Sequence, residues 1–121
     1  MRYFISGHGD LTQQEFNEHY VHVLREACRD NASTFVIGDF RGADVMAQLF
    51  LARTIHPCRI TVYHMSLFPR FCVDGAATIG GFRSDNERDK AMTHASDRDI
   101  AWVRPGREKS GTAKNLKRRK G

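Results

Sequence analysis

Apolar and polar residues alternate along the chain in blocks whose period changes from one block to the next. Short apolar runs bounded by polar or turn-forming residues are typical of strands, and apolar residues spaced three to four positions apart are typical of helices. Four such runs predict strands, at residues 3–6, 34–37, 59–64 and 100–103. Helical spacing or helix-start signals follow each of them, apart from the long segment after the third run.

Two capping boxes mark helix starts. Thr12 begins the sequence Thr-Gln-Gln-Glu and Ser84 begins Ser-Asp-Asn-Glu, so that side chains can satisfy the free amides of each first turn. Together with apolar spacing, these signals predict helices at residues 12–29, 42–55, 84–95 and from 112 onward. Residues 66–81 show no clear period, and we expect a long connection there that serves as a lid or binding loop or contains a short helix.

The alternation of strands and helices predicts the α/β class. We expect a three-layer, Rossmann-like fold with a mostly parallel sheet, strand order 3-2-1-4 and helices on both faces. A chain of 121 residues is long enough for one such domain and too short for two. The expected domain covers residues 1–116, and residues 117–121 are expected to form a basic C-terminal tail.

Three glycine-bearing turns are expected to meet at one edge of this sheet. Ligands of open parallel sheets bind beyond the carboxyl ends of the strands where the strand order reverses, here next to loops 6–10 and 104–112. Beside them, Gly38 ends a buried strand and Gly42 opens a helix. The first amides of that helix have no intrahelical partner and favour an anion such as phosphate. The alternative is an ordinary turn whose glycines serve backbone geometry only.

Composition restricts the class of protein. Forty per cent hydrophobic and 27% charged residues are usual for a soluble globular chain. No apolar run approaches the roughly 18 residues of a membrane span, and the N-terminus lacks the apolar region of a signal peptide. We therefore expect a cytoplasmic protein with no membrane partner. The three cysteines are widely spaced and the histidines show no metal-ligand spacing, so we expect neither a metal site nor a cofactor.

The positive charge is concentrated at the C-terminus. Residues 104–121 contain eight basic residues and one acidic residue, a net charge of +7, so the remainder of the chain has −2. Such a segment can bind nucleic acid or can be a solvated, frayed end. No aromatic residues for base stacking lie between the charges, which favours the solvated end.

A series of short motifs carries a family resemblance. The first block runs from Gly38 to Asp44, and later blocks comprise Arg88 and Met92 on one helix, then Ser96-Asp97, Pro105-Gly106 and Ser110-Gly111-Thr112. In this order the motifs resemble the SLOG superfamily, the Rossmann-like nucleotide-binding proteins that include the LOG phosphoribohydrolases, the YpsA-like proteins and the DprA core. The match spans residues 1–116.

The resemblance implies a nucleotide or nucleotide-derived ligand with its phosphate in the glycine-lined crevice, and a possible homodimer. LOG proteins hydrolyse the N-glycosidic bond of nucleoside monophosphates with an arginine and a glutamate. Arg88 stands at the arginine position, but Asn115 stands in place of the glutamate and cannot act as a general base. In addition, Asp89 replaces the asparagine of the YpsA-like pattern.

Three functions remain open at this point: nucleotide binding without turnover, hydrolysis of nucleoside monophosphates, and single-stranded nucleic-acid binding of the DprA type. Asn115 favours the first over the second, and the charge of residues 1–103 counts against the third. For catalysis we select Arg88 and Asp39, the carboxylate with the least structural explanation. The predicted ligand-binding residues are Gly7, His8, Gly38, Arg41, Gly42, Asp44, Ser110, Gly111 and Thr112.

Overall fold

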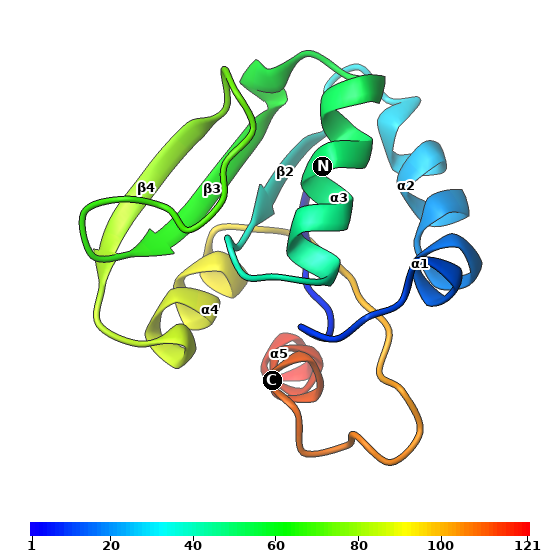
Figure 1. Cartoon of the computed structure of the whole chain (residues 1–121), viewed down its shortest axis with the longest axis vertical. Coiled ribbons are helices and arrows are strands. Elements are labelled where there is room, and N and C mark those ends of the chain that lie inside the picture. The colour runs from blue at the N-terminus through cyan, green and yellow to red at the C-terminus, as the bar shows by residue number, and fades with distance from the viewer.

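The computed structural model describes all 121 residues and has an α/β, Rossmann-like fold (Figure 1). Its five strands are all parallel and lie in the order β4-β3-β2-β1-β5. The strands are β1 (Arg2–Ile5), β2 (Thr34–Ile37), β3 (Ile60–Met65), β4 (Ala77–Phe82) and β5 (Arg98–Ile100). The helices are α1 (Gln13–His19), α2 (Val21–Cys28), α3 (Ala43–Thr54), α4 (Asp85–His94) and α5 (Gly111–Lys120), with a short 3-10 turn at Pro57–Arg59.

The predicted strand order 3-2-1-4 corresponds to β3-β2-β1-β5 and is confirmed for those four strands. The fifth strand, β4, corrects the expectation of a loop over residues 66–81, because it pairs in parallel with β3 at the edge of the sheet. Its sequence, Ala-Thr-Ile-Gly-Gly-Phe, contains two glycines, and five of its six residues are exposed. An edge strand that buries so little has no apolar period to detect. The last strand also lies earlier than predicted, at Arg98–Ile100.

The core has two parts, one on each face of the sheet. One face packs against α1, α2 and α3 through the larger cluster, which includes the buried residues Ile5, Phe35 and Leu51. The other face carries a smaller cluster in which Met92 of α4 packs against Phe4 and Val36. Adjacent strand residues therefore point to opposite faces, as expected for a sheet covered by helices on both sides. Helix α5 packs against α4 and β5 and completes this second layer (Figure 1).

The predicted helix over residues 12–29 is divided in two at Tyr20. Tyr20 is fully buried, and its hydroxyl donates to the carbonyl oxygen of Ser6 at 2.8 Å. The same hydroxyl accepts from the N–H of Trp102 at 3.0 Å. Trp102 in turn stacks on the ring of His19, with 3.9 Å between the centroids. This phenol therefore joins the break between α1 and α2 to the segments that follow β1 and β5.

The basic C-terminal residues belong to the fold. Residues 117–120, expected as a tail, form the last turn of α5. The Arg119 guanidinium bonds to both carboxylate oxygens of Asp99 and to the carbonyl and hydroxyl of Ser96. Positive charge in the last turn of a helix also interacts favourably with the helix dipole. None of the helices combines the length and the apolar character needed to cross a membrane.

Candidate functional site

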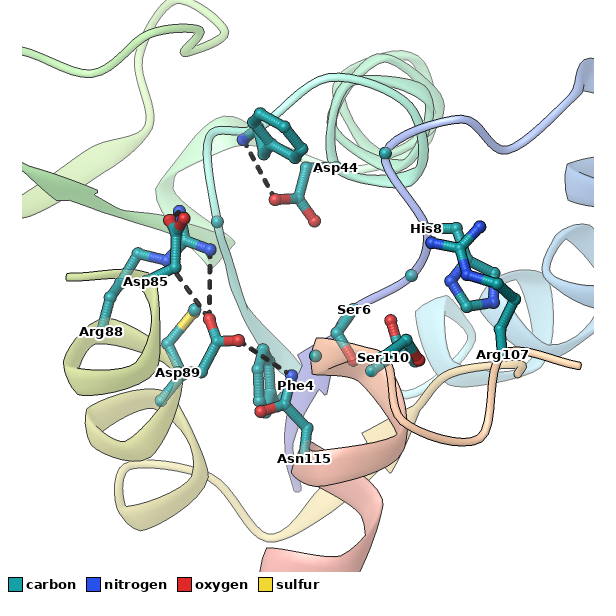
Figure 2. A pocket seen from close by; sticks show the side chains of 17 residues that line it. Phe4, Ser6, His8, Asp44, Asp85, Arg88, Asp89, Arg107, Ser110 and Asn115 are labelled. Carbon is teal, nitrogen blue, oxygen red and sulfur yellow. Dashed lines mark hydrogen bonds and ion pairs between the residues drawn. The ribbon is translucent and has the colours of Figure 1, made fainter. Parts of the chain in front are cut away.

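A cavity of about 230 Å³ lies at the carboxyl edge of the sheet, between the loops after β1 and β2, helix α4 and the start of α5 (Figure 2). Only three of its 17 lining residues are hydrophobic. Eight of the eleven predicted site residues line this cavity: Gly7, His8, Gly38, Asp44, Arg88, Ser110, Gly111 and Thr112. The other three, Asp39, Arg41 and Gly42, do not.

The start of α5 offers free hydrogen-bond donors to the cavity. Ser110 is the N-cap, and its Oγ accepts from the N–H of Ala113 at 3.2 Å. The N–H groups of Gly111 and Thr112 donate to no acceptor of the chain. Both residues line the cavity, so these amides and the positive end of the helix dipole are available to an anion.

Two side chains of the β1–α1 loop add to these donors. Ser6 is buried and lines the cavity, but its Oγ has no hydrogen-bond partner. Nε2 of His8 accepts from the N–H of Arg104 at 2.9 Å, so the ring proton lies on Nδ1. Burial, with smaller contributions from Arg107 and Arg104, lowers the pKa of His8. At neutral pH His8 is therefore an uncharged imidazole that can donate from Nδ1. Arg107 lines the same side of the cavity.

At the start of α3, in contrast to α5, acceptors of the chain occupy the first helix amide and one amide of the preceding turn, whereas the N–H groups of Asp44 and Val45 donate to no acceptor of the chain. The N–H of Ala43 donates to the carbonyl oxygen of His8 at 3.1 Å, and the N–H of Phe40 donates to Oδ2 of Asp44 at 3.1 Å. Gly42 has a φ of 75°, and a Cβ there would lie 2.5 Å from the His8 carbonyl oxygen. A Cβ at Gly38 would lie 2.6 Å from Oδ2 of Asp44. At both positions, atoms of the protein itself occupy the space that a side chain would need, and only glycine fits there.

Asp39 is a positioning residue. It is buried, and its Oδ1 accepts from Arg88 and from Arg70, each at 2.8 Å. Its Oδ2 accepts from the N–H of Arg70 at 2.7 Å. Burial opposes ionisation, but the hydrogen bonds from Arg70 outweigh it and lower the pKa of Asp39. The ionised carboxylate holds the two guanidinium groups and does not contact the cavity. Arg41 also lies outside, with its guanidinium 4.8 Å from the centroid of the Phe40 ring.

Arg88 lines the cavity, but its charge is shared among several carboxylates. Besides Asp39, it lies 3.3 Å from Asp85 and 3.1 Å from Asp89. Figure 2 shows Asp85 and Asp89 beside it on the side of the cavity that α4 forms. Because the guanidinium is buried and ion-paired in this way, it is not free to clamp a phosphate.

Two carboxyl groups of the cavity wall have perturbed pKa values. Burial raises the pKa of Asp44 to about 7 against the opposing effect of Arg88, and Asp89 and Asp39 raise it further. Burial also raises the pKa of Asp89, again opposed by Arg88 and by a hydrogen bond from Asn115. That bond joins Asn115 Nδ2 to Asp89 Oδ2 at 3.2 Å and connects α5 with α4.

Asp89, Asp85, Ser6 and Arg107 are cavity residues that the sequence did not select. One signal was available for Asp89. It and Asn115 are two positions at which the chain departs from the patterns it resembles, and the fold places their side chains in contact. Position 115 lacks the carboxylate that the resemblance implies, and the carboxylate of Asp89 on α4 lies beside Asn115.

The cavity thus has two chemically different ends. We call Ser6, His8 and the start of α5 (Ser110, Gly111 and Thr112) the donor end, and Asp44, Asp85 and Asp89 the acidic end (Figure 2). The arrangement can bind an anion at one end and hydroxyl groups at the other. A scan against protein-family models, a search of curated proteins and a search of solved structures each returned no match. Membership of the SLOG superfamily therefore stays a prediction from the motifs.

Proposed function

We propose that the protein binds a nucleotide or nucleotide-derived ligand, with the phosphate at the donor end of the cavity. The observation that carries this proposal is the open start of α5, where the amides of Gly111 and Thr112 have no acceptor. Both residues line a cavity that is also lined by Ser6, whose buried hydroxyl has no partner. A buried hydroxyl without a partner is costly, and a phosphate oxygen would satisfy it. The motif order in the sequence supports the same ligand class.

Position 111 provides a direct test. Gly111 is the first residue of α5, where proline is well tolerated because its missing N–H is not needed by the helix. The backbone of Ser110, at φ −68° and ψ 166°, is also compatible with a following proline. Gly111→Pro therefore removes one of the proposed phosphate-binding amides and leaves the helix intact. Gly111→Ala is the matched control, because a Cβ there meets nothing and the N–H is kept.

We expect calorimetric titration to show binding of inorganic phosphate and of a nucleoside monophosphate, with little binding of the corresponding nucleoside. A hydrogen bond to a charged group contributes about 1.5–3 kcal/mol, so Gly111→Pro should weaken phosphate binding roughly tenfold or more. Gly111→Ala should bind within about twofold of the native protein. Equal affinities for the proline and alanine variants would contradict a phosphate at this helix start.

A second candidate, hydrolysis of the N-glycosidic bond of a nucleoside monophosphate, is favoured by the perturbed carboxyl groups. A carboxylic acid with a pKa of about 7, such as Asp44, suits a general acid at neutral pH, and Asp89 lines the same cavity. Release of free base from a panel of nucleoside monophosphates tests this function. We expect Asp44→Asn or Asp89→Asn to abolish any such release, and release that survives both substitutions would rule out this mechanism.

A further inference from the structure

The two ends of the cavity also restrict what is attached to the phosphate. We infer that the ligand carries a single phosphate on a hydroxylated sugar, and that Asp44 and Asp89 accept hydrogen bonds from the sugar hydroxyls. This inference rests on the proposed function, since it takes the phosphate to lie at the donor end. It adds the number of phosphates and the residues that select the sugar.

Unused hydrogen-bonding capacity at the acidic end supports a hydroxylated ligand. Oδ2 of Asp44 accepts from the N–H of Phe40, whereas Oδ1 has no hydrogen bond within the chain. Asp44 is only 7% exposed and lines the cavity, so this oxygen depends on a ligand or water for a partner. Oδ1 of Asp89 accepts from Nε and Nη2 of Arg88, whereas Oδ2 accepts only from Asn115 and has a further lone pair. Both carboxyl groups can therefore accept from hydroxyl groups.

The charge at the acidic end excludes a second phosphate there. Asp44, Asp85 and Asp89 line the cavity, and Asp39, outside the lining, pairs with Arg88 at 2.8 Å. Only two guanidinium groups, those of Arg88 and Arg70, lie among these carboxyl groups. A phosphate placed beside Asp44 and Asp89 would meet negative charge at low dielectric. A ligand with phosphates at both ends is thus disfavoured.

The position of Arg88 argues against a cationic group at the same end. Its guanidinium bonds to Asp89 and lies against Asp85, on the same side of the cavity. An ammonium group bound there would be repelled by the guanidinium, whereas a neutral hydroxyl would not. Sugar hydroxyls therefore fit this end better than an amine.

The size of the cavity agrees with a sugar phosphate. Its volume of about 230 Å³ is below the roughly 300–1,000 Å³ typical of pockets that enclose drug-sized ligands. A ribosyl phosphate fits such a volume, and a base attached to it would project from the opening. We therefore expect the affinity for nucleoside monophosphates to depend little on the base.

Calorimetric titration of the native protein with a probe series tests the inference. The probes are inorganic phosphate, ribose 5-phosphate, 2-deoxyribose 5-phosphate, ribose 1,5-bisphosphate and O-phosphoethanolamine. We expect ribose 5-phosphate to bind at least tenfold tighter than inorganic phosphate and than the bisphosphate, and several-fold tighter than the deoxy sugar or phosphoethanolamine. Asp89→Asn should remove most of the advantage of ribose 5-phosphate and leave the affinity for inorganic phosphate within about twofold. Asp74→Asn, on the exposed loop before β4, is the control and should change neither affinity.

The outcomes separate the two proposals. If inorganic phosphate binds but ribose 5-phosphate binds no tighter, the sugar inference is wrong and the proposed phosphate site stands. Tighter binding of the bisphosphate or of phosphoethanolamine also overturns the inference. If no phosphate-bearing probe binds, both proposals fail. Because the probe series uses the native protein, a variant that does not fold cannot obscure the result.

Discussion

Two helix starts lie at the same edge of the sheet, and they differ in which of their backbone amides the protein's own acceptors occupy. At α3, the amides of Phe40 and Ala43 bond to the Asp44 carboxylate and to the His8 carbonyl oxygen. At α5, the amides of Gly111 and Thr112 bond to nothing in the chain. Both turns contain glycine, and both follow a strand of the same sheet. A glycine-bearing turn therefore does not by itself define an anion site, because the protein's own acceptors can occupy some of its amides first.

A second difference lies in how the two turns are held. The α3 turn is fixed by direct backbone contacts, which leave no room for a side chain at Gly42. The loop before α5 is fixed by ion pairs, because Arg104 bonds to Glu15 at 2.7 Å and to Asp10 at 3.1 Å. Substitutions in the α3 turn should therefore change mainly the stability of the fold. Substitutions around the start of α5 should change mainly ligand binding.

The largest expected effect comes from placing the same side chain in the two turns. Gly42→Ala forces a Cβ into backbone carbonyl groups at a positive φ, so it should lower the free energy of unfolding by about 3 kcal/mol. Gly111→Ala meets no atom and should change it by less than about 0.5 kcal/mol. Urea unfolding followed by circular dichroism measures both. A loss below about 1 kcal/mol in Gly42→Ala would show that the α3 turn is not rigidly packed.

The next largest effect concerns Asp44, whose carboxyl group accepts from the Phe40 amide in the α3 turn, and the pH dependence of stability. The pKa of Asp44 is about 7 in the folded protein, above its ordinary value of 3.8. Between these pH values the folded state holds the proton more tightly, so this group lowers the free energy of unfolding as the pH rises from about 4 to about 7. The upper limit is about 4 kcal/mol, from three pH units at 1.36 kcal/mol each.

Asp44→Asn removes this titration and keeps an oxygen for the Phe40 amide. We expect the variant to gain stability relative to the native protein as the pH increases from 5 to 8, by on the order of 2 kcal/mol. Urea unfolding at the two pH values measures the gain. As a control, Asp74→Asn on the exposed loop should have the same free energy of unfolding as the native protein at both pH values. A variant whose difference from the native protein does not change with pH would mean that Asp44 is ionised throughout this range.

A smaller effect is expected for the ion pairs that hold the α5 loop. Arg104→Ala leaves Glu15 without its bidentate partner and frees the loop that presents Ser110 and Gly111. Phosphate affinity should fall several-fold, with a decrease of a few degrees in Tm. Arg29→Ala breaks an exposed pair with Glu26 and should change neither quantity appreciably. Unchanged phosphate binding in Arg104→Ala would show that the α5 start keeps its position without the clamp.

The smallest effect on stability is expected at Ser6. Its hydroxyl has no partner in the chain, so Ser6→Ala should leave the free energy of unfolding unchanged within about 0.5 kcal/mol or raise it slightly. Phosphate binding should nevertheless weaken several-fold, because a hydrogen-bond donor at the donor end of the cavity is lost. If affinity stayed the same in this variant, the hydroxyl would not belong to the phosphate site.

The sequence predicted the fold to the extent that its elements bury apolar residues. Three of the predicted apolar runs are strands, the last strand lies two residues earlier than its run, and the order of the four follows from the rules for parallel connections. The edge strand β4 could not be found, because exposed small and polar residues give no period. The C-terminal basic residues were misjudged for a related reason, since Arg119 is held by bonds to Asp99 and Ser96 that are distant in sequence.

The sequence located the edge of the sheet at which the cavity lies, but it did not assign the roles of the acids. Asp39 seemed free because nothing near it in sequence explains it, yet Arg70 and Arg88 occupy both its oxygens. Asp44 seemed explained by the helix dipole, yet it is the buried acid with a free oxygen in the cavity. These roles depend on which side chain meets which across long sequence separations, and periodicity contains no information about that.

The chain contains a single tryptophan, Trp102, and its surroundings make it a natural optical reporter. Its amide bonds to the Tyr20 hydroxyl, which also bonds to the Ser6 carbonyl, and its ring lies 6.2 Å from that of His8, centroid to centroid. A ligand that shifts Ser6 or His8 changes the environment of the indole without any attached dye. Intrinsic fluorescence emission should therefore follow occupancy of the cavity in real time and give association rates from unlabelled protein.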